Sequence, residues 1–217
     1  MSTLICFALK EEAMSFRKIA TGKPDVSILI VGIGRENAEK SIRDHLATHS
    51  PAVVLTCGFA GGLNPELEIG DVVFELPLKQ QLEPSNIISI QKLTAAGASP
   101  AKFFCANRIA TTVAEKQKVR TETGADVVEM ESAAIHAVCA ERDIPCMTVR
   151  VISDTAHEDL PLDFNQLSKP DKSLDFGKLA WAIARSPGKI GALMALQKKT
   201  SFAAKELAAV LEKIISA

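Results

Sequence analysis

No apolar stretch in this 217-residue sequence approaches the ~18 residues that a membrane-spanning helix needs. The first residues also lack the basic region and cleavage site of a secretory signal peptide. Lysines and arginines are scattered along the chain, and acids nearly balance them, with a formal net charge of −1. The sequence therefore has no membrane span and no electrostatic footprint for nucleic acid, so we expect no nucleic-acid partner.

The cysteines form no CxxC pair, and their number is odd. They lie mostly inside apolar runs, which favours buried thiols in a reducing compartment over disulfides. None of the four histidines has a ligand spacing with cysteine or aspartate, so we expect no metal and no cofactor. We expect the protein to be cytoplasmic. The cysteines are Cys6, Cys57, Cys105, Cys139 and Cys146.

A glycine-rich segment at 56–65 lacks the Lys-Ser/Thr end of a P-loop, which disfavours nucleoside triphosphate chemistry. Its glycines follow an apolar run, where the absence of a Cβ lets backbone approach a flat ligand closely. Such a cluster is also common in ordinary tight turns. The Gly-Ile-Gly at 32–34 is too short and too common a pattern to identify a dinucleotide site.

Short apolar runs alternate with helical patterns, and 47% of the residues are apolar, enough for a sizeable core. We predict one α/β domain at residues 1–217, with a mostly parallel central mixed sheet flanked by helices. Strands are expected at Leu4–Leu9, Ser27–Val31, Val53–Cys57, Val72–Leu76, Lys102–Ala106, Val127–Met130 and Met147–Ile152. Helices are expected at Glu36–Thr48, Val113–Arg120, Ser132–Arg142, Leu174–Arg185, Lys189–Lys199 and Phe202–Ile215.

Three further expectations concern local structure. Thr112 and Glu115 have the spacing of a capping box at the start of a helix. The sequence at 186–188, Ser-Pro-Gly, predicts a break between helices in a tail that packs against the sheet or a partner. The stretch from Pro77 to Pro100 reads as a mobile loop beside the site, because it combines prolines, scattered polar residues and an Ala-Ala-Gly-Ala-Ser run.

Three acids stand at the ends of two apolar runs. Glu129 and Glu131 follow the run at 127–128, and Asp154 follows the run at 147–152. The helix between the runs predicts a βαβ unit, and ligands of an open parallel sheet bind beyond the carboxyl ends of the strands. We therefore expect the three acids to line one pocket.

The charged residues that could act in the site also have plain structural explanations. Glu12, like its neighbour Glu11, can be a first-turn acid favoured by the helix dipole, and so can Glu131. Asp154 can be an N-cap or loop acid. Arg150 lies inside an apolar strand, so it needs a partner there and is either a site residue or half of a structural ion pair.

The sequence resembles the nucleoside phosphorylase and nucleosidase superfamily, and its layout is close to that of the 5'-methylthioadenosine/S-adenosylhomocysteine nucleosidases. Five ordered segments carry the resemblance and span most of the chain. They are Ala8–Ala13, Val31–Gly34, Gly58–Val73, Val128–Glu131 and Val149–Asp154. The segments Asn107–Thr111, Ala114–Lys116 and Ser186–Lys199 are more similar to the hopanoid-associated phosphorylase branch, whose substrate is an adenosyl lipid.

The resemblance implies cleavage of the N-glycosidic bond of a 5'-modified purine nucleoside, with adenine as the expected base, through an oxocarbenium-like transition state. It assigns Asp154 as the general acid at purine N7, provided that burial raises the pKa of this carboxyl. It places Glu12 on the attacking water with Arg150 nearby, and Glu131 on the ribose hydroxyls. The implied substrate-binding set is Met130, Glu131, Glu129, Ser153, Phe59, Ala60, Gly61, Arg108 and Ile109, in which Glu129 is expected in the hydrogen-bond network rather than on the substrate.

Two departures leave the base preference open. Phe59 replaces a small hydroxyl residue, and Ile109 lies near the usual position of a stacking aromatic. The nucleophile is also open. An acid at Glu12 repels phosphate and favours hydrolysis, whereas phosphorolysis, with inorganic phosphate as co-substrate, needs Arg35 or Lys10 to supply a cation.

A non-catalytic nucleoside-binding protein on the same fold is a third possibility. It would need no acid on an attacking water and none on the leaving base. In every case we expect a small-molecule nucleoside as ligand, and the resemblance implies a homo-oligomer, a dimer or larger.

Overall fold

The computed structural model describes residues 2–76, 90–167 and 187–216. Its strands form one sheet with the order β2-β1-β3-β8-β4-β5, and β7 pairs with both β3 and β6. The strands are β1 Thr3–Phe7, β2 Val26–Ile30, β3 Val53–Gly62, β4 Val72–Glu75, β5 Ser99–Ala101, β6 Phe103–Cys105, β7 Val127–Glu129 and β8 Cys146–Asp154. The helices are α1 Lys10–Ala20, α2 Arg35–Leu46, α3 Ile90–Ala96, α4 Val113–Thr123, α5 Ser132–Ala140, the 3-10 turn η2 Pro187–Lys189, and α7 Ile190–Ser216.

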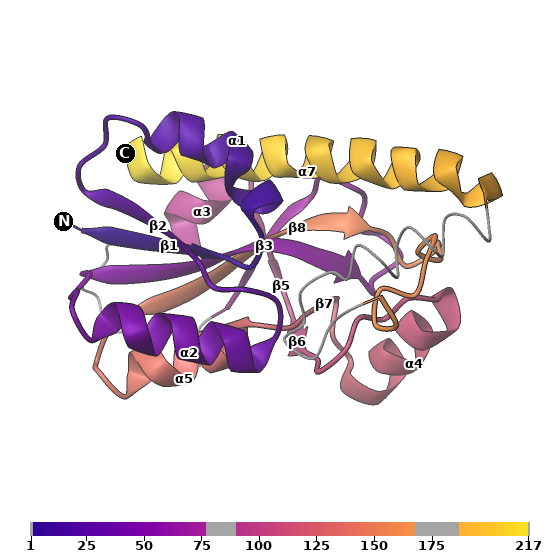
Figure 1. Ribbon diagram of the computed structural model, residues 1–217, viewed down its shortest axis with the longest axis horizontal. Coiled ribbons are helices and arrows are strands. Elements are labelled where there is room, and N and C mark those ends of the chain that lie inside the picture. Colours follow the sequence, from indigo (N-terminus) through magenta and orange to yellow (C-terminus); the bar gives the residue numbers. More distant parts are fainter. Residues whose placement is uncertain (1, 77–89, 168–186, 217) are drawn as a thin grey trace.

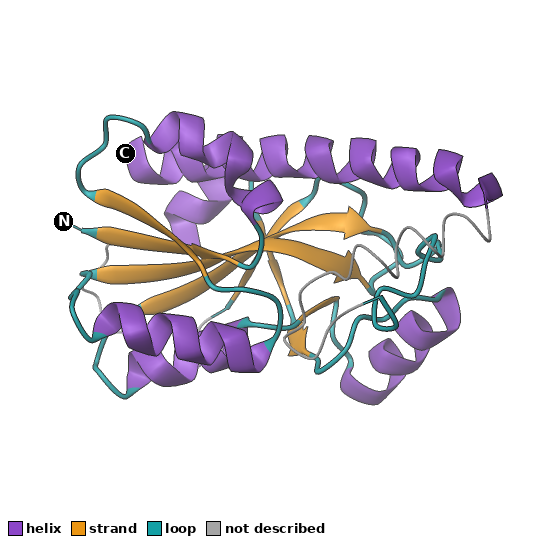
Figure 2. Ribbon diagram, in the orientation of Figure 1, coloured by secondary structure: helices purple, strands orange, loops and turns teal. Residues whose placement is uncertain are grey.

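Helices cover both faces of the sheet (Figure 1). Helices α1, α3 and α7 lie on one face, and α2 and α5 lie on the other. Most described strand pairs are parallel, and the antiparallel ones are β3 with β7 and β4 with β8. The predicted fold class is thus confirmed, and the alternation of helix and strand along the chain is visible in Figure 2.

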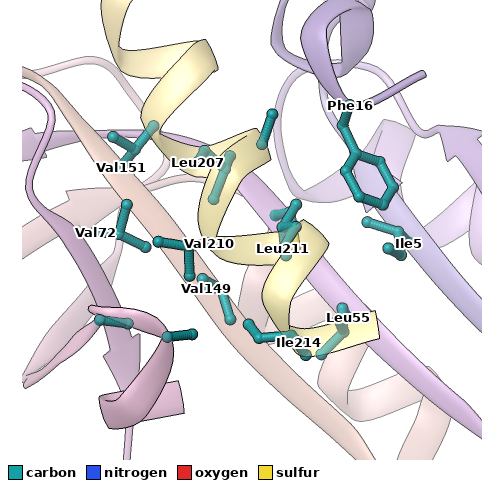
Figure 3. Close-up of a cluster of buried hydrophobic side chains, with 14 of the residues drawn as sticks. Ile5, Phe16, Leu55, Val72, Val149, Val151, Leu207, Val210, Leu211 and Ile214 are labelled. Carbon is teal, nitrogen blue, oxygen red and sulfur yellow. The ribbon is translucent and has the colours of Figure 1, made fainter. Parts of the chain in front are cut away.

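Helix α7 packs on the sheet within the largest of the buried hydrophobic clusters (Figure 3). Its side chains Leu207, Leu211 and Ile214 are buried against Val149 and Leu55 of the sheet. Each such side chain contributes roughly 1.5–3 kcal/mol when it is fully buried. The expectation that the tail packs on the sheet is confirmed. No helix of the described part combines the length and hydrophobicity that crossing a bilayer requires.

The division of the tail into helices at 189–199 and 202–215 is wrong, because α7 runs through the junction. The hydroxyl of Thr200 donates to the carbonyl of Leu196, 3.1 Å away on the same helix. Its side chain is therefore satisfied within the helix, and the helix continues through this position. The predicted break at 186–188 is consistent with the short η2 turn before α7. The predicted helix at 174–185 lies outside the described residues.

The mobile loop predicted at 77–100 is wrong for its described part. Residues 90–96 form α3, whose Leu93 and Ala96 are buried in the core with α7. Residues 99–101 form β5, which pairs with β4 at the edge of the described sheet, where Pro100 is tolerated. Tertiary packing rather than local sequence stabilises this segment. Residues 77–89 lie outside the described part.

The predicted βαβ unit is also wrong in one respect. Strand β7 is antiparallel to β3, whereas β8 is parallel to β3, so the two strands that α5 connects run in opposite directions. Short apolar runs carry no signal for strand direction, because direction is set by which edge the strand joins. The reversal turns out to be what builds the site.

Candidate active site

Two strands end facing each other along β3. Strand β1 pairs with the first half of β3, whereas β7 runs the other way and pairs with Gly61 and Gly62 at its end. Both lie on the same edge of β3, because β8 pairs along the opposite edge. The carboxyl ends of β1 and β7 therefore face each other across residues 58–60, and the acids that follow them converge on this interval.

Glu12 belongs to the first turn of α1, directly after β1. Its Oε1 accepts a hydrogen bond from the backbone N–H of Phe59 (2.9 Å), and its Oε2 accepts one from the N–H of Leu9 (2.9 Å). Burial raises the pKa of this carboxyl, and these backbone donors together with Arg150 oppose the rise. Glu12 is thus more than a first-turn acid, because its carboxylate binds the backbone of β3 at Phe59, between the ends of β1 and β7.

Arg150 lies on β8 in register with Gly58 and is only 1% exposed. Its Nη2 donates to Glu129 Oε2 at 2.7 Å and to Thr56 Oγ1 at 3.1 Å, and lies 3.6 Å from Glu131 Oε2. Its Nε is buried without a hydrogen-bond partner among the described residues. The two explanations that the sequence left open for Arg150 are therefore not exclusive, because its ion pairs lie inside the acid cluster.

Glu129 connects the start of α5 to Arg150 through its carboxylate. Its carboxylate accepts hydrogen bonds from the N–H groups of Glu131 (3.0 Å) and Ser132 (2.8 Å) and from the Ser132 hydroxyl (2.6 Å). Burial raises the pKa of Glu129, but Arg150 and Ser132 outweigh it and lower the pKa overall. Its oxygens are occupied by α5 and Arg150, which places Glu129 in the hydrogen-bond network, as expected.

Glu131 is the N-cap residue of α5, yet its side chain makes no capping hydrogen bond. Its Oε1 instead accepts from the backbone N–H of Gly34, 2.8 Å away at the start of α2. Burial raises the pKa of Glu131 to about 7; Arg150 lowers it and Glu129 raises it further. The Gly-Ile-Gly at 32–34 thus serves an acid of the cluster through its backbone.

Asp154 ends β8 beyond the other end of the interval. Its Oδ1 accepts a hydrogen bond from the Ser153 hydroxyl (2.8 Å), which also lies 3.3 Å from the carbonyl of Ala60. A Cβ added at Gly61 would lie 3.3 Å from Asp154 Oδ2, so the glycine leaves the space in front of the carboxylate open. Ala60, Gly61 and Ser153, which the resemblance assigns to the substrate, therefore lie around Asp154.

Lys116 is a member of this site that the sequence did not reveal. It lies on α4, is 0% exposed, and its Nζ is 2.6 Å from Asp154 Oδ2. The Nζ also donates to the carbonyls of Thr155 (2.5 Å) and Glu158 (3.1 Å). Nothing in the local pattern marks this lysine as buried; the resemblance of 114–116 to the lipid-linked branch was the one available signal.

The predicted capping box before Lys116 is half right. The Thr112 hydroxyl accepts from the N–H of Glu115 (3.2 Å), but the Glu115 carboxylate reaches Thr111 instead of returning to Thr112. Glu115 also pairs with Arg108, whose side chain is 61% exposed. The start of α4 is thereby fixed, which sets the position of Lys116.

Ile109 lies on the segment that leads into α4. Its N–H donates to Asn165 Oδ1 (2.9 Å), and Asn165 donates back to its carbonyl (3.0 Å). This segment is tied to the chain that follows Asp154, whereas the Arg108 guanidinium points largely to solvent. Of the remaining predicted residues, Met130 is buried and Phe59 is half-buried.

The arrangement defines an acid-lined site in an α/β protein. Within residues 2–76, 90–167 and 187–216, no group of three or more His, Cys, Asp or Glu residues is placed to hold a metal ion. The carboxylates instead surround one guanidinium and one ammonium. Such a site is suited to acid–base chemistry on a ligand that becomes positively charged.

Comparison with known proteins places this chain in a family. The family model described as the phosphorylase superfamily matches residues 8–74 and 102–185. The chain therefore belongs to the phosphorylase superfamily.

Relatives within it are nucleosidases. An aminodeoxyfutalosine nucleosidase of Campylobacter jejuni is 32% identical over 62% of this chain and 69% of its own length. A 5'-methylthioadenosine/S-adenosylhomocysteine nucleosidase of Shewanella sediminis is 28% identical over 65% of this chain and 74% of its own.

Solved structures share the fold. The 5'-methylthioadenosine/S-adenosylhomocysteine nucleosidase of Neisseria meningitidis, in complex with methylthio-immucillin-A, superposes with a TM-score of 0.70 at 17% identity, covering 99% of this chain and 98% of that one. The futalosine hydrolase of Helicobacter pylori superposes with a TM-score of 0.69 at 17% identity, covering 100% and 97%.

Proposed function

We propose that this protein is an enzyme that hydrolyses the N-glycosidic bond of a 5'-modified purine nucleoside, with adenine as the base. The observation that carries the proposal is that three acids meet at β3: Glu12 accepts from the N–H of Phe59, Glu131 lies 3.6 Å from Arg150, which is in register with Gly58, and Asp154 lies beside Gly61. The nucleosidase activities named for its relatives support the reaction class.

The chemistry assigns a task to each acid. As the bond from C1' to N9 breaks, the ribosyl group becomes cationic and the base gains electrons, so the site must stabilise one and protonate the other. Asp154 delivers the proton at N7. Glu131 binds the ribose hydroxyls above Met130, and Glu12 orients the water and takes its proton as the oxygen bonds to C1'.

The charge of the cluster favours water over phosphate. Among the described residues, Glu12, Glu129 and Glu131 share the guanidinium of Arg150, so carboxylates outnumber cations in this cluster once Glu12 and Glu131, whose pKa values burial raises, are ionised. Two like unit charges about 5 Å apart repel by roughly 3 kcal/mol at an effective dielectric of about 20. Arg35 and Lys10, the cations that phosphorolysis would recruit, are exposed. A dianionic nucleophile would therefore be opposed where a neutral one is not.

The 5' substituent sets the substrate. The relatives are named for methylthio, homocysteinyl and futalosine-type nucleosides, so we propose a substrate with a bulky group at this position. We further propose that the protein acts in the cytoplasm, in keeping with its free cysteines, and that it self-associates. Light scattering on the purified protein tests the assembly.

A nucleoside panel with varied phosphate tests the function. Adenosine, inosine, 5'-methylthioadenosine, S-adenosylhomocysteine, futalosine and adenosyl lipids are incubated with the enzyme, and free base, ribose and ribose 1-phosphate are measured. Release of free sugar without phosphate supports hydrolysis, and formation of sugar phosphate assigns phosphorolysis instead. Binding of adenine without release of base from any nucleoside would make the chain a binding protein.

A further inference from the structure

Lys116 and Asp154 form an ion pair that is almost entirely withdrawn from water. The side chain of Lys116 is 0% exposed and that of Asp154 is 10% exposed, with 2.6 Å between Nζ and Oδ2. Burying an ammonium costs several kcal/mol unless it is paired and its protons are satisfied. Lys116 meets this condition with one carboxylate and the carbonyls of Thr155 and Glu158.

The neighbouring charges have other partners. Glu158, in the segment after β8, pairs its carboxylate with Lys199 of α7. On α4 itself, Glu115 pairs with Arg108. Among the described residues, the carboxylate paired with Lys116 is therefore that of Asp154.

The other groups on α4 are directed elsewhere. Arg120 lies 3.5 Å from Asp126, and Lys118 lies 3.9 Å from Glu122. Asp154 Oδ1, the oxygen that does not face Lys116, accepts from the Ser153 hydroxyl. Within the pair, each group is thus the other's ionic partner. The pair lies at the end of residues 58–60 of β3, where the resemblance places the leaving base.

We propose that Lys116 supplies the proton that Asp154 passes to the leaving base. The inference rests on the proposed function and adds a positioning residue to it. The pair starts as an ammonium and a carboxylate; as the bond breaks, its electron pair moves to the base, and one proton passes from Lys116 through the carboxylate of Asp154 to N7. The pair leaves this step as a neutral amine and a carboxylate, and the proton that Glu12 takes from water balances the loss.

The pair differs from a lone carboxyl group in its response to pH. Model carboxyl groups keep a proton up to about pH 4 and model ammonium groups up to about pH 10. An enzyme that draws its proton from the pair keeps its activity above neutral pH. An enzyme whose general acid is a lone carboxyl group loses activity as that carboxyl group ionises.

The experiment measures kcat and KM against pH for the wild type and for Lys116→Met, which removes the ammonium and keeps the length of the side chain. We expect kcat at pH 8 to fall at least tenfold, KM to change less than threefold, and the alkaline limb of the kcat profile to move to lower pH by one unit or more. Lys118→Met, on an exposed lysine of the same helix, is the matched control and should leave the profile unchanged.

Lys116→Arg separates charge from proton supply, because a guanidinium keeps its proton throughout this pH range. We expect kcat in Lys116→Arg to stay low even where the fold is intact by circular dichroism. Wild-type kcat in Lys116→Arg, or a loss in Lys116→Met without movement of the alkaline limb, overturns the proposal.

The wild type alone decides the matter if Lys116→Met does not fold. An alkaline limb above about pH 8 supports proton supply by the pair, and a limb below that pH overturns it. Failure of the proposed function is distinguishable, since the wild type would then release no base. If the wild type releases base, Asp154→Asn does not, and Lys116→Met matches the wild type, only the inference about Lys116 fails.

Discussion

The carboxylate of Glu12 occupies the space in front of Gly58 that any other residue's Cβ would fill. An ideal Cβ at this glycine would lie 2.8 Å from Oε1 and 2.9 Å from Oε2 of Glu12. The glycine also has a φ of +146°, a conformation that L residues rarely adopt. For the glycine-rich segment, the sequence left open a close approach to a ligand or an ordinary tight turn; at Gly58 the missing Cβ instead makes room for the carboxylate of Glu12.

Gly58→Ala should therefore disable the enzyme. The added methyl group displaces Glu12 from the N–H of Phe59, and an ångström-scale misplacement of a reacting group can cost about 100-fold in rate. We expect kcat to fall by about that factor, with roughly 1–3 kcal/mol of lost stability from backbone strain. Steady-state kinetics and urea denaturation measure the two effects.

Gly22→Ala is the matched control. Gly22 also has a positive φ, +85°, but a Cβ there meets nothing within 4 Å. This variant should lose stability and keep its kcat. If both glycine variants keep kcat, Glu12 does not act from this position.

Glu12→Gln tests the acid itself. The amide oxygen can accept from only one of the two backbone N–H groups that Glu12 now binds, so some stability is lost, and the amide cannot take a proton from water. General base catalysis contributes typically 10²–10⁴-fold, and we expect kcat to fall within that range while KM changes little. The exposed neighbour offers the control, because Glu11→Gln removes a first-turn acid without touching the interval of β3. Equal losses in the two variants would return Glu12 to a helix-dipole role.

The sequence predicted the sheet class and singled out Glu129, Glu131 and Asp154, because acids after apolar runs are local features, and the resemblance added Glu12. The sequence did not predict that β7 is antiparallel, since a three-residue apolar run carries no direction. Lys116 was missed for a related reason. A lysine on a helix is normally exposed, and its burial depends on where α4 meets the end of β8, which is decided by contacts such as that of Thr155.

The buried ion pair of Glu129 with Arg150 should contribute strongly to the free energy of unfolding. Removing one partner of a buried ion pair leaves an uncompensated charge and costs about 3–5 kcal/mol. We expect Glu129→Gln to lower the free energy of unfolding by about this amount, measured by urea denaturation at pH 7. Glu39→Gln removes a half-exposed partner of Arg43 and should cost about 0–1 kcal/mol. Similar costs in both variants would show that Arg150 finds a substitute partner.

Glu131 should make stability depend on pH. Burial raises its pKa from 4.5 to about 7, so between these pH values the folded protein keeps a proton that the unfolded chain releases. A raised pKa stabilises the fold fully below pH 4.5, and the contribution is lost as pH rises through 7. At 1.36 kcal/mol for each pKa unit, the loss is about 3 kcal/mol.

Glu131→Gln removes this dependence because an amide does not titrate. The difference in unfolding free energy between variant and wild type should move in favour of the variant by about 3 kcal/mol between pH 4 and pH 8, as measured by urea denaturation across that range. Glu141→Gln provides the opposite sign: its partner Arg43 lowers the pKa of Glu141, so the wild type gains relative to that variant as pH rises. A difference for Glu131→Gln that stays constant from pH 4 to pH 8 would mean that folding leaves the pKa of this carboxyl at its ordinary value. Burial and Arg150 would then offset each other, and Glu131 would meet the ribose as an anion at neutral pH.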